Sequence, residues 1–122
     1  MGVDVELSKK ALEQTQGNLA KIPGLTVYST IGIHPHEAVR YIDDVSIHND
    51  IRELEKIYQS NISKVVAVGE CGLDYFFDPN FIPPTLTVNN LKDLQRQLFQ
   101  AQIDLAKRLK LPLIVHCRDD RS

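Results

Sequence analysis

Side chains that can bind a metal ion follow three separate apolar segments of this 122-residue chain. His34 and His36 come directly after the first segment. Glu70 ends the second, and His116 follows the third. If these segments are parallel strands, their carboxyl ends meet at one edge of the sheet, where the ligands of α/β folds bind. A carboxylate and imidazoles held there suit zinc, manganese or magnesium, so the pattern indicates a candidate metal site.

Each of these side chains also has an interpretation that involves no metal. A glutamate at a strand end is often solvated or caps a helix, and a histidine after valine is about as often a core or loop residue as a ligand. The segment His34-Pro35-His36 is also compatible with a simple turn. The coincidence at three strand ends favours a metal site, and these alternatives stay open.

Two aspartates and two cysteines lie close to the candidate ligands. Asp74 and Asp119 lie just beyond strand ends, where they either act in acid–base catalysis, orient a ligand or cap a loop. Cys71 and Cys117 each follow a candidate ligand by one residue, so strand alternation turns them away from it. We expect both to be buried, inert thiols, in a reducing, intracellular setting. His48 lies ahead of a predicted helix and is expected to face solvent.

Helices and strands are predicted to alternate along the sequence. Apolar residues at helical spacing predict the helices, and short apolar or β-branched runs predict the strands. The predicted elements are a helix from Asp4 to Ile22 ended by Pro23-Gly24, a strand over Leu25–Ile33, a helix capped by Asp50 and running to Ser60, a strand over Lys64–Glu70, a helix capped by Asn90 that ends at Pro112, and a strand that begins at Leu113. A long loop is predicted from Cys71 to about Asn89. In the second strand, alternation places Val66, Val68 and Glu70 on one face.

This order of elements predicts an α/β fold with a parallel sheet and right-handed crossovers. Three strands cannot close such a sheet, and they leave edges that a complete domain normally covers. We therefore expect the chain to be part of a larger domain.

The composition excludes several classes of protein. The chain is 43% hydrophobic and 25% charged, as globular proteins are. No apolar run is long enough to cross a membrane, and the first residues lack the pattern of a secretion signal, so we expect a cytoplasmic or nuclear protein. With 14 basic and 16 acidic residues, the chain has no broad basic surface, and any binding of nucleic acid would depend on a local site.

Four segments of the chain resemble the TatD family of metal-dependent hydrolases. They are Gly32–Ala38, Val68–Tyr75, Gln95–Ala106 and Leu111–Asp119, and they occur in the family's order. The resemblance implies that residues 1–122 form part of a TIM-type (β/α)8 barrel, with roughly three βα units and parallel strands. It also implies metal-dependent hydrolysis of phosphodiester bonds, often by a deoxyribonuclease that trims 3′ ends.

The resemblance assigns metal ligands and a cofactor. Glu70 matches a carboxylate that bridges two metals, and His116 matches a histidine ligand of one of them. The implied cofactor is one or two divalent ions of magnesium, manganese or zinc. The implied partner is DNA as substrate. No obligate protein partner is inferred, and the lack of a long apolar run argues against a membrane.

The same resemblance places further residues around the metals. His34 and His36 match a segment that lines the active site near the substrate. Tyr75 and Arg118 fall in motif positions that imply substrate binding. Asp74 and Asp119, the two aspartates described above, are the implied catalytic residues.

Parts of the family's pattern have no counterpart in the chain. The family's first strand carries a His-x-His metal pair, and none lies upstream of Leu25. The context of His34–His36 matches the second region instead, and a later histidine and a final aspartate are missing before Ser122. Asp120 stands where the family usually has alanine, and Phe81–Asn90 looks inserted. We therefore expect an incomplete chain, lacking the first strand and the C-terminal half of the barrel, with little nuclease activity by itself.

Two alternatives to a TatD-type nuclease remain at the level of the sequence. One is an amidohydrolase-like enzyme that acts on amides or phosphotriesters, which a panel of substrates would separate from a nuclease. The other is a catalytically dead, truncated chain with a binding or regulatory role, which a measurement of metal binding would separate from both.

Overall fold

The computed structural model describes residues 4–16, 23, 28–41, 44–77 and 86–119. In chain order its elements are helix α1 (Val5–Gln16), strand β1 (Ser29–Ile31), the 3-10 helix η2 (Pro35–Arg40), helix α2 (Asp44–Ser60), strand β2 (Val65–Asp74), helix α3 (Val88–Leu109) and strand β3 (Leu113–Arg118). Within these residues the strands form one parallel sheet in the order β1-β2-β3. The predicted α/β fold with parallel strands is therefore confirmed.

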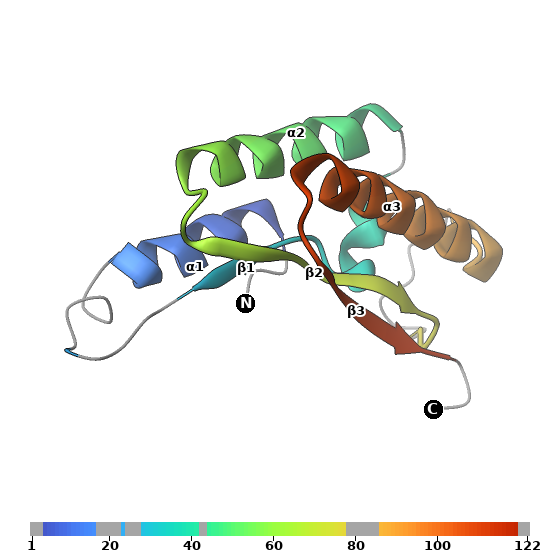
Figure 1. Cartoon of the computed structure of the whole chain (residues 1–122). Helices are drawn as coiled ribbons and strands as arrows, with labels where there is room; N and C mark the ends of the chain where they lie inside the picture. The colour runs from blue at the N-terminus through green and yellow to red at the C-terminus, as the bar shows by residue number, and fades with distance from the viewer. Residues whose placement is uncertain (1–3, 17–22, 24–27, 42–43, 78–85, 120–122) are drawn as a thin grey trace.

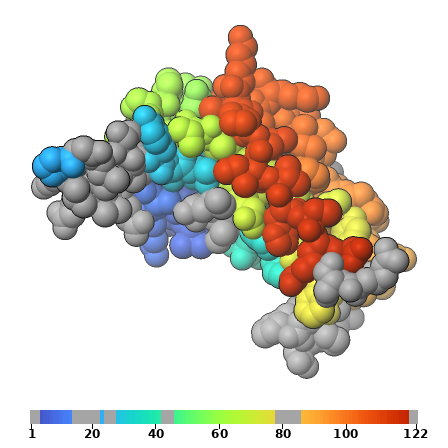
Figure 2. Space-filling view, turned by 60° about the horizontal axis from the view of Figure 1, so that its bottom comes forward, coloured from blue at the N-terminus to red at the C-terminus, as the bar shows by residue number. Residues whose placement is uncertain are grey.

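The helices α1, α2 and α3 lie on one side of the sheet, and the other face is open in the described part of the chain (Figure 1). Figure 2 brings this open face forward, with β3 crossing it in red. The core lies between the helices and the sheet, where Ile31, Leu54, Val68, Leu98 and Leu105 are almost fully buried. Burial of this apolar surface holds the helices on the sheet.

Strand β2 does not alternate regularly, because its pairing shifts twice. One shift lies between Val65 and Ala67 opposite β1, and the other lies between Val68 and Cys71 opposite β3. Val66 is exposed while Val68 is fully buried. The prediction of one common face for Val66, Val68 and Glu70 is therefore wrong, since an extra residue at a bulge changes the direction of the side chains that follow it.

Two helices begin earlier than predicted. Helix α2 starts at Asp44, so Asp50 lies inside it, and the Asp50 carboxylate accepts a 2.6 Å hydrogen bond from the Tyr41 hydroxyl instead of capping the helix. Helix α3 is capped by Thr87, and Asn90 is its partner in a reciprocal capping box, with both hydrogen bonds 3.1 Å long. Asp50 and Asn90 are residue types that cap helices. In the structure, however, Asp50 binds the Tyr41 hydroxyl, and Asn90 completes the capping box of Thr87.

The other predicted elements agree with the structure over part of their length. Asp4 caps α1 by accepting a 2.8 Å hydrogen bond from the Leu7 N–H, as predicted. The predicted ends of that helix over residues 17–22, and the start of the next strand at residues 25–27, lie outside the described residues. Strand β2 continues through Cys71 to Asp74, where a loop was predicted, because β3 pairs with that segment.

The cysteines differ in their environments. Cys71 is fully buried, as predicted, and burial raises the pKa of its thiol to about 11, which disfavours the reactive thiolate. Cys117 is exposed, and the prediction that it is buried is wrong. It lies on β3, an edge strand of the described sheet.

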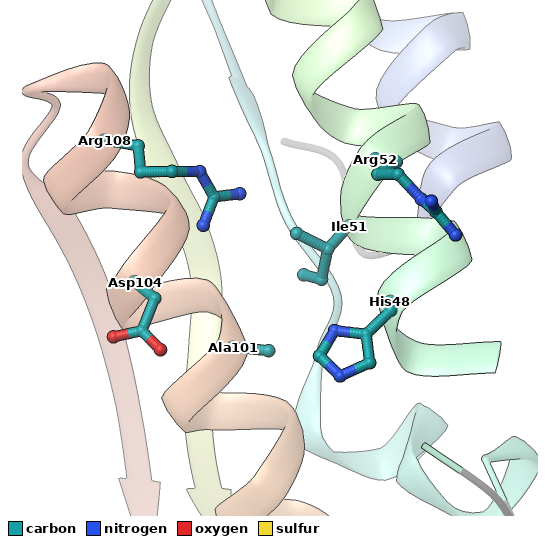
Figure 3. A pocket seen from close by; sticks show the side chains of 6 residues that line it. All are labelled: His48, Ile51, Arg52, Ala101, Asp104 and Arg108. Atoms are coloured by element: carbon teal, nitrogen blue, oxygen red, sulfur yellow. The ribbon is translucent and has the colours of Figure 1, made fainter. Parts of the chain in front are cut away.

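A groove lies between α2 and α3 on the helical side of the molecule (Figure 3). It has a volume of about 440 Å³ and is lined by His48, Ile51, Arg52, Ala101, Asp104 and Arg108. His48 is exposed, as predicted, but it lies within α2 and not ahead of it. Among the described helices, none is long and apolar enough to cross a membrane.

Candidate metal centre

The carboxyl ends of the three strands bring the predicted metal-binding side chains together. His34 directly precedes η2 and is the third residue after β1, Glu70 lies in the irregular part of β2, and His116 lies near the end of β3. The Glu70 Oε1 is 3.3 Å from the His116 Nδ1 and 3.6 Å from the His34 Nε2. Parallel strand direction therefore produces the convergence that the sequence predicted.

Asp74, the last residue of β2, lies at the centre of this cluster and is fully buried. Its Oδ2 is 2.9 Å from the Nε2 atoms of both His36 and His116. Arg118 binds it in a fork, with Nε 3.0 Å from Oδ1 and Nη2 3.0 Å from Oδ2. The ligand atoms of His34, Asp74 and His116 all lie within 4.8 Å of one another, so these residues are a candidate metal-binding group.

Hydrogen bonds oppose the effect of burial on the charge of Asp74. Burial alone would raise the pKa of this carboxyl, but hydrogen bonds from Arg118 and His116 lower it from 3.8 to about 2. Asp74 is therefore a carboxylate at neutral pH, and it is a weak proton acceptor.

His34 is oriented by the start of η2. Its Nδ1 accepts a 3.1 Å hydrogen bond from the His36 N–H, so the proton of the neutral ring is assigned to Nε2, which faces Glu70. Burial and the neighbouring rings of His36 and His116 lower the pKa of His34. The neutral ring is thus favoured, and it presents an N–H donor toward the centre of the site.

His116 connects the two carboxylates. Its Nδ1 faces Glu70 and its Nε2 faces Asp74 at 2.9 Å. A histidine that donates one ring N–H to a carboxylate is fixed in the tautomer that leaves the other nitrogen free to bind a metal. The arrangement therefore suits a cation between Glu70 and His116, with Asp74 holding the ring.

The remaining predicted site residues divide into two groups. His36 and Arg118 join the cluster through Asp74. Tyr75 turns toward α3, where its hydroxyl accepts a 3.2 Å hydrogen bond from the Arg96 Nη1. Asp119 directly follows β3 and is exposed. The structure thus brings six of the predicted residues together, namely His34, His36, Glu70, Asp74, His116 and Arg118.

Comparison with known proteins identifies the family of the chain. Residues 1–122 match the family described as TatD related DNase. The chain belongs to the TatD family. It is 38% identical over 121 residues to a 3′-5′ ssDNA/RNA exonuclease TatD from Musicola paradisiaca, a match that covers 99% of this chain and 38% of that protein. It is 42% identical over 92 residues to the exonuclease of the same name from Rahnella sp., covering 75% of this chain and 28% of that protein.

A solved structure and a further relative agree with this TatD assignment. YJJV, a TatD homologue from Escherichia coli K12, aligns with a TM-score of 0.70 and 28% identity, over 96% of this chain and 37% of that one. An uncharacterized metal-dependent hydrolase of Bacillus subtilis, YabD, is 37% identical over 93 residues. The chain spans between 28% and 38% of the length of the two exonucleases named above.

Two buried glutamines of α3 hold the strand ends of this TatD-family site, and the sequence analysis missed them. Gln102 accepts a 2.8 Å hydrogen bond from the Ile33 N–H and donates one of 3.0 Å to the Ile33 carbonyl. Gln95 binds both backbone groups of Asp74 in the same way, at 2.8 and 2.7 Å. Each amide therefore replaces a neighbouring strand at a point where sheet pairing ends. The sequence feature that could have indicated them is the position of two glutamines within the apolar stripe of the helix, two turns apart.

Replacing Gln102 by leucine is expected to reduce the free energy of unfolding by about 1–3 kcal/mol, because the buried backbone groups of Ile33 lose their partner. Urea denaturation measures this loss. Gln97→Leu, at an exposed position of the same helix, is the matched control and should change stability by less than about 0.5 kcal/mol. Equal effects of the two substitutions would contradict the role of Gln102.

The lowered pKa of Asp74 predicts a pH dependence of stability in the metal-free chain. A carboxyl whose pKa falls from 3.8 unfolded to about 2 folded stabilises the fold by roughly 2 kcal/mol above pH 4, and this contribution disappears as the pH falls toward 2. Asp74→Asn should therefore cost about 2 kcal/mol at pH 7 and little at pH 2. Denaturation of both proteins in EDTA across this range measures the difference, and a constant difference would contradict the assignment.

Proposed function

We propose that this chain contributes to the active site of a metal-dependent hydrolase that cleaves phosphodiester bonds of single-stranded nucleic acid from the 3′ end. The observation that carries the proposal is the convergence of Glu70, Asp74 and His116 from two neighbouring strands. The His116 Nδ1 is 3.3 Å from the Glu70 Oε1, and the His116 Nε2 is 2.9 Å from the Asp74 Oδ2. The names of the TatD relatives, 3′-5′ ssDNA/RNA exonucleases, support the choice of substrate and polarity.

The donor set fits a divalent cation. It combines carboxylate oxygens with imidazole nitrogens, which magnesium, manganese and zinc accept to different degrees. We assign Glu70 and the His116 Nδ1 as ligands and Asp74 as the carboxylate that orients His116. One or two such cations, when bound, would supply a nucleophile from water at neutral pH and stabilise negative charge on the phosphate.

The other residues of the cluster are placed to bind the phosphate. The His34 Nε2–H points toward Glu70 and can donate to a phosphate oxygen beside it. His36 is half exposed, and Arg118 is partly exposed beside Asp74, so both can reach a bound strand. Outside the cluster, Asp119 directly follows β3 and stays a predicted catalytic residue, since the low pKa of Asp74 makes Asp74 a poor base.

A segment exchange tests the proposed function. In the Musicola paradisiaca exonuclease, the segment that matches this chain is replaced by residues 1–122. We expect the chimera to shorten a 5′-labelled single strand from its 3′ end only when a divalent cation is present. A folded chimera that is inactive, or one that prefers an amide or a phosphotriester in a substrate panel, would contradict the proposal.

The 122-residue chain alone should bind a divalent cation but cleave little nucleic acid. Within its described residues, the site residues come from the ends of three strands, whereas a closed barrel surrounds its site with residues from several more. Rapid cleavage by the purified chain, lost on Glu70→Ala, would contradict this expectation. A chain that binds no cation at all would favour a binding or regulatory role.

We also propose a cytoplasmic or nuclear location, with DNA or RNA as the partner. Both cysteines are free thiols, and Cys117 is exposed, which suits a reducing compartment. Fractionation of cells that express the tagged protein would test the location.

A further inference from the structure

Three consecutive aromatic residues, Tyr75, Phe76 and Phe77, follow β2 beside the candidate metal centre. The rings of Tyr75 and Phe77 stack on each other, with centroids 6.2 Å apart and planes 28° apart. The Lys92 ammonium lies 4.7 Å from the Tyr75 centroid, and Arg96 binds the Tyr75 hydroxyl. The rings of Tyr75 and Phe77 are therefore engaged with each other, and Tyr75 also contacts α3.

Phe76 has a different environment, because its ring lies over Arg118 and remains 48% exposed. The Arg118 Cζ is 4.7 Å from the ring centroid, and the same guanidinium forks onto Asp74. The Phe76 N–H also donates a 3.1 Å hydrogen bond to the Asp74 Oδ1. One guanidinium thus separates a half-exposed aromatic ring from the carboxylate at the centre of the site.

We propose that Phe76 is a stacking platform for an unpaired base of the nucleic-acid strand whose phosphate lies at the candidate metal centre. The ligand class is a single strand, because a base in a duplex is already stacked and paired, whereas an unpaired base can lie on an aromatic face whatever its identity. Arg118 fixes the ring on one side and adds positive charge next to the strand. This inference rests on the proposed phosphodiester substrate and adds a base-binding position that the ligand set does not include.

The test measures binding by the 122-residue chain in the presence of Ca²⁺, so that a cation offsets the charge of the carboxylates while cleavage stays slow. Fluorescence anisotropy compares a short labelled oligodeoxynucleotide with a strand of the same length whose nucleotides are abasic. We expect Phe76→Ala to weaken binding of the normal strand about tenfold and to leave binding of the abasic strand unchanged. Phe76→Trp should restore the affinity.

Tyr28→Ala is the matched control, because Tyr28 is an aromatic residue with 55% exposure that precedes β1, at the opposite end of the sheet. It should change neither affinity by more than about twofold. Equal weakening of the normal and the abasic strand by Phe76→Ala would mean that the ring only supports Arg118, and the proposal would fail. It would also fail if Phe76→Ala had no effect or if the wild-type chain bound neither strand.

The outcome is independent of the segment-exchange experiment. A chimera that cleaves while Phe76→Ala leaves strand binding intact would keep the proposed function and remove the stacking platform. A chimera without nuclease activity, together with base-dependent binding through Phe76, would keep the stacking platform and remove the proposed function. The thermal melting of Phe76→Ala, compared with the wild-type chain, confirms that the variant is folded when its binding is measured.

Discussion

Replacing Glu70 by glutamine should abolish binding of a divalent cation while leaving the fold intact. The amide has the same shape, but it lacks the charge that faces the His116 Nδ1 at 3.3 Å. Loss of a residue that only orients a ligand typically costs about 10–100-fold in metal affinity, so loss of a ligand should cost more than about 100-fold. In the chimera we expect the rate of cleavage to fall roughly a thousandfold, since a bound metal is worth several kcal/mol at the transition state.

The measurement is a manganese titration followed by the electron paramagnetic resonance signal of the free ion. His48→Ala is the control, because His48 is an exposed histidine in the groove between α2 and α3, which contains none of the site residues. Asp74→Asn should weaken binding only about 10–100-fold, as expected for a residue that orients His116. If Asp74→Asn abolished binding and Glu70→Gln did not, the metal would instead be held by His34, Asp74 and His116.

Replacing Gly72 by alanine should disrupt the candidate metal centre through the backbone, and not through the loss of a ligand. Gly72 has φ +137°, a conformation that residues with a side chain rarely adopt, and an added Cβ would lie 2.1 Å from the His116 carbonyl oxygen. Gly72 pairs with His116 across β2 and β3, so the clash cannot be relieved without separating these strands. We expect the free energy of unfolding to fall by roughly 3 kcal/mol or more.

Urea denaturation and manganese titration together measure the effect of Gly72→Ala, because separation of β2 from β3 also separates Asp74 from His116. Ser63→Ala, at an exposed position in the turn before β2, should alter neither measurement by more than about 0.5 kcal/mol. A Gly72→Ala protein with wild-type stability and metal affinity would show that the β2–β3 pairing is not needed for the site.

The convergence of His34, Glu70 and His116 could be predicted from the sequence because it depends on two local properties. Apolar runs indicate buried strands, and parallel strands place all their carboxyl ends at one edge. The candidate metal-binding side chains follow those runs directly, so their approach needs no knowledge of how the helices pack. The apolar stripe of α3 could be predicted for a similar reason, since the spacing of Leu91, Leu98 and Leu105 is a property of one helix.

The roles of Gln95, Gln102 and Phe76 could not be predicted in the same way. A glutamine on a helix becomes a partner for Ile33 or Asp74 only when that helix packs across the strand end, at a residue that is distant in the sequence. Phe76 acquires its position from Arg118, which lies on another strand. These contacts form between segments far apart in the chain, and local periodicity contains no information about them.

The sequence by itself determined the α/β order of the elements, the family, and the set of candidate metal-binding side chains at the strand ends, because each of these depends on residue type and local spacing. The tertiary structure alone decided that Asp74 is the centre of the cluster. Its carboxylate is buried among His36, His116 and Arg118, which arrive from η2 and β3, and these donors keep it charged where burial alone would favour the neutral acid.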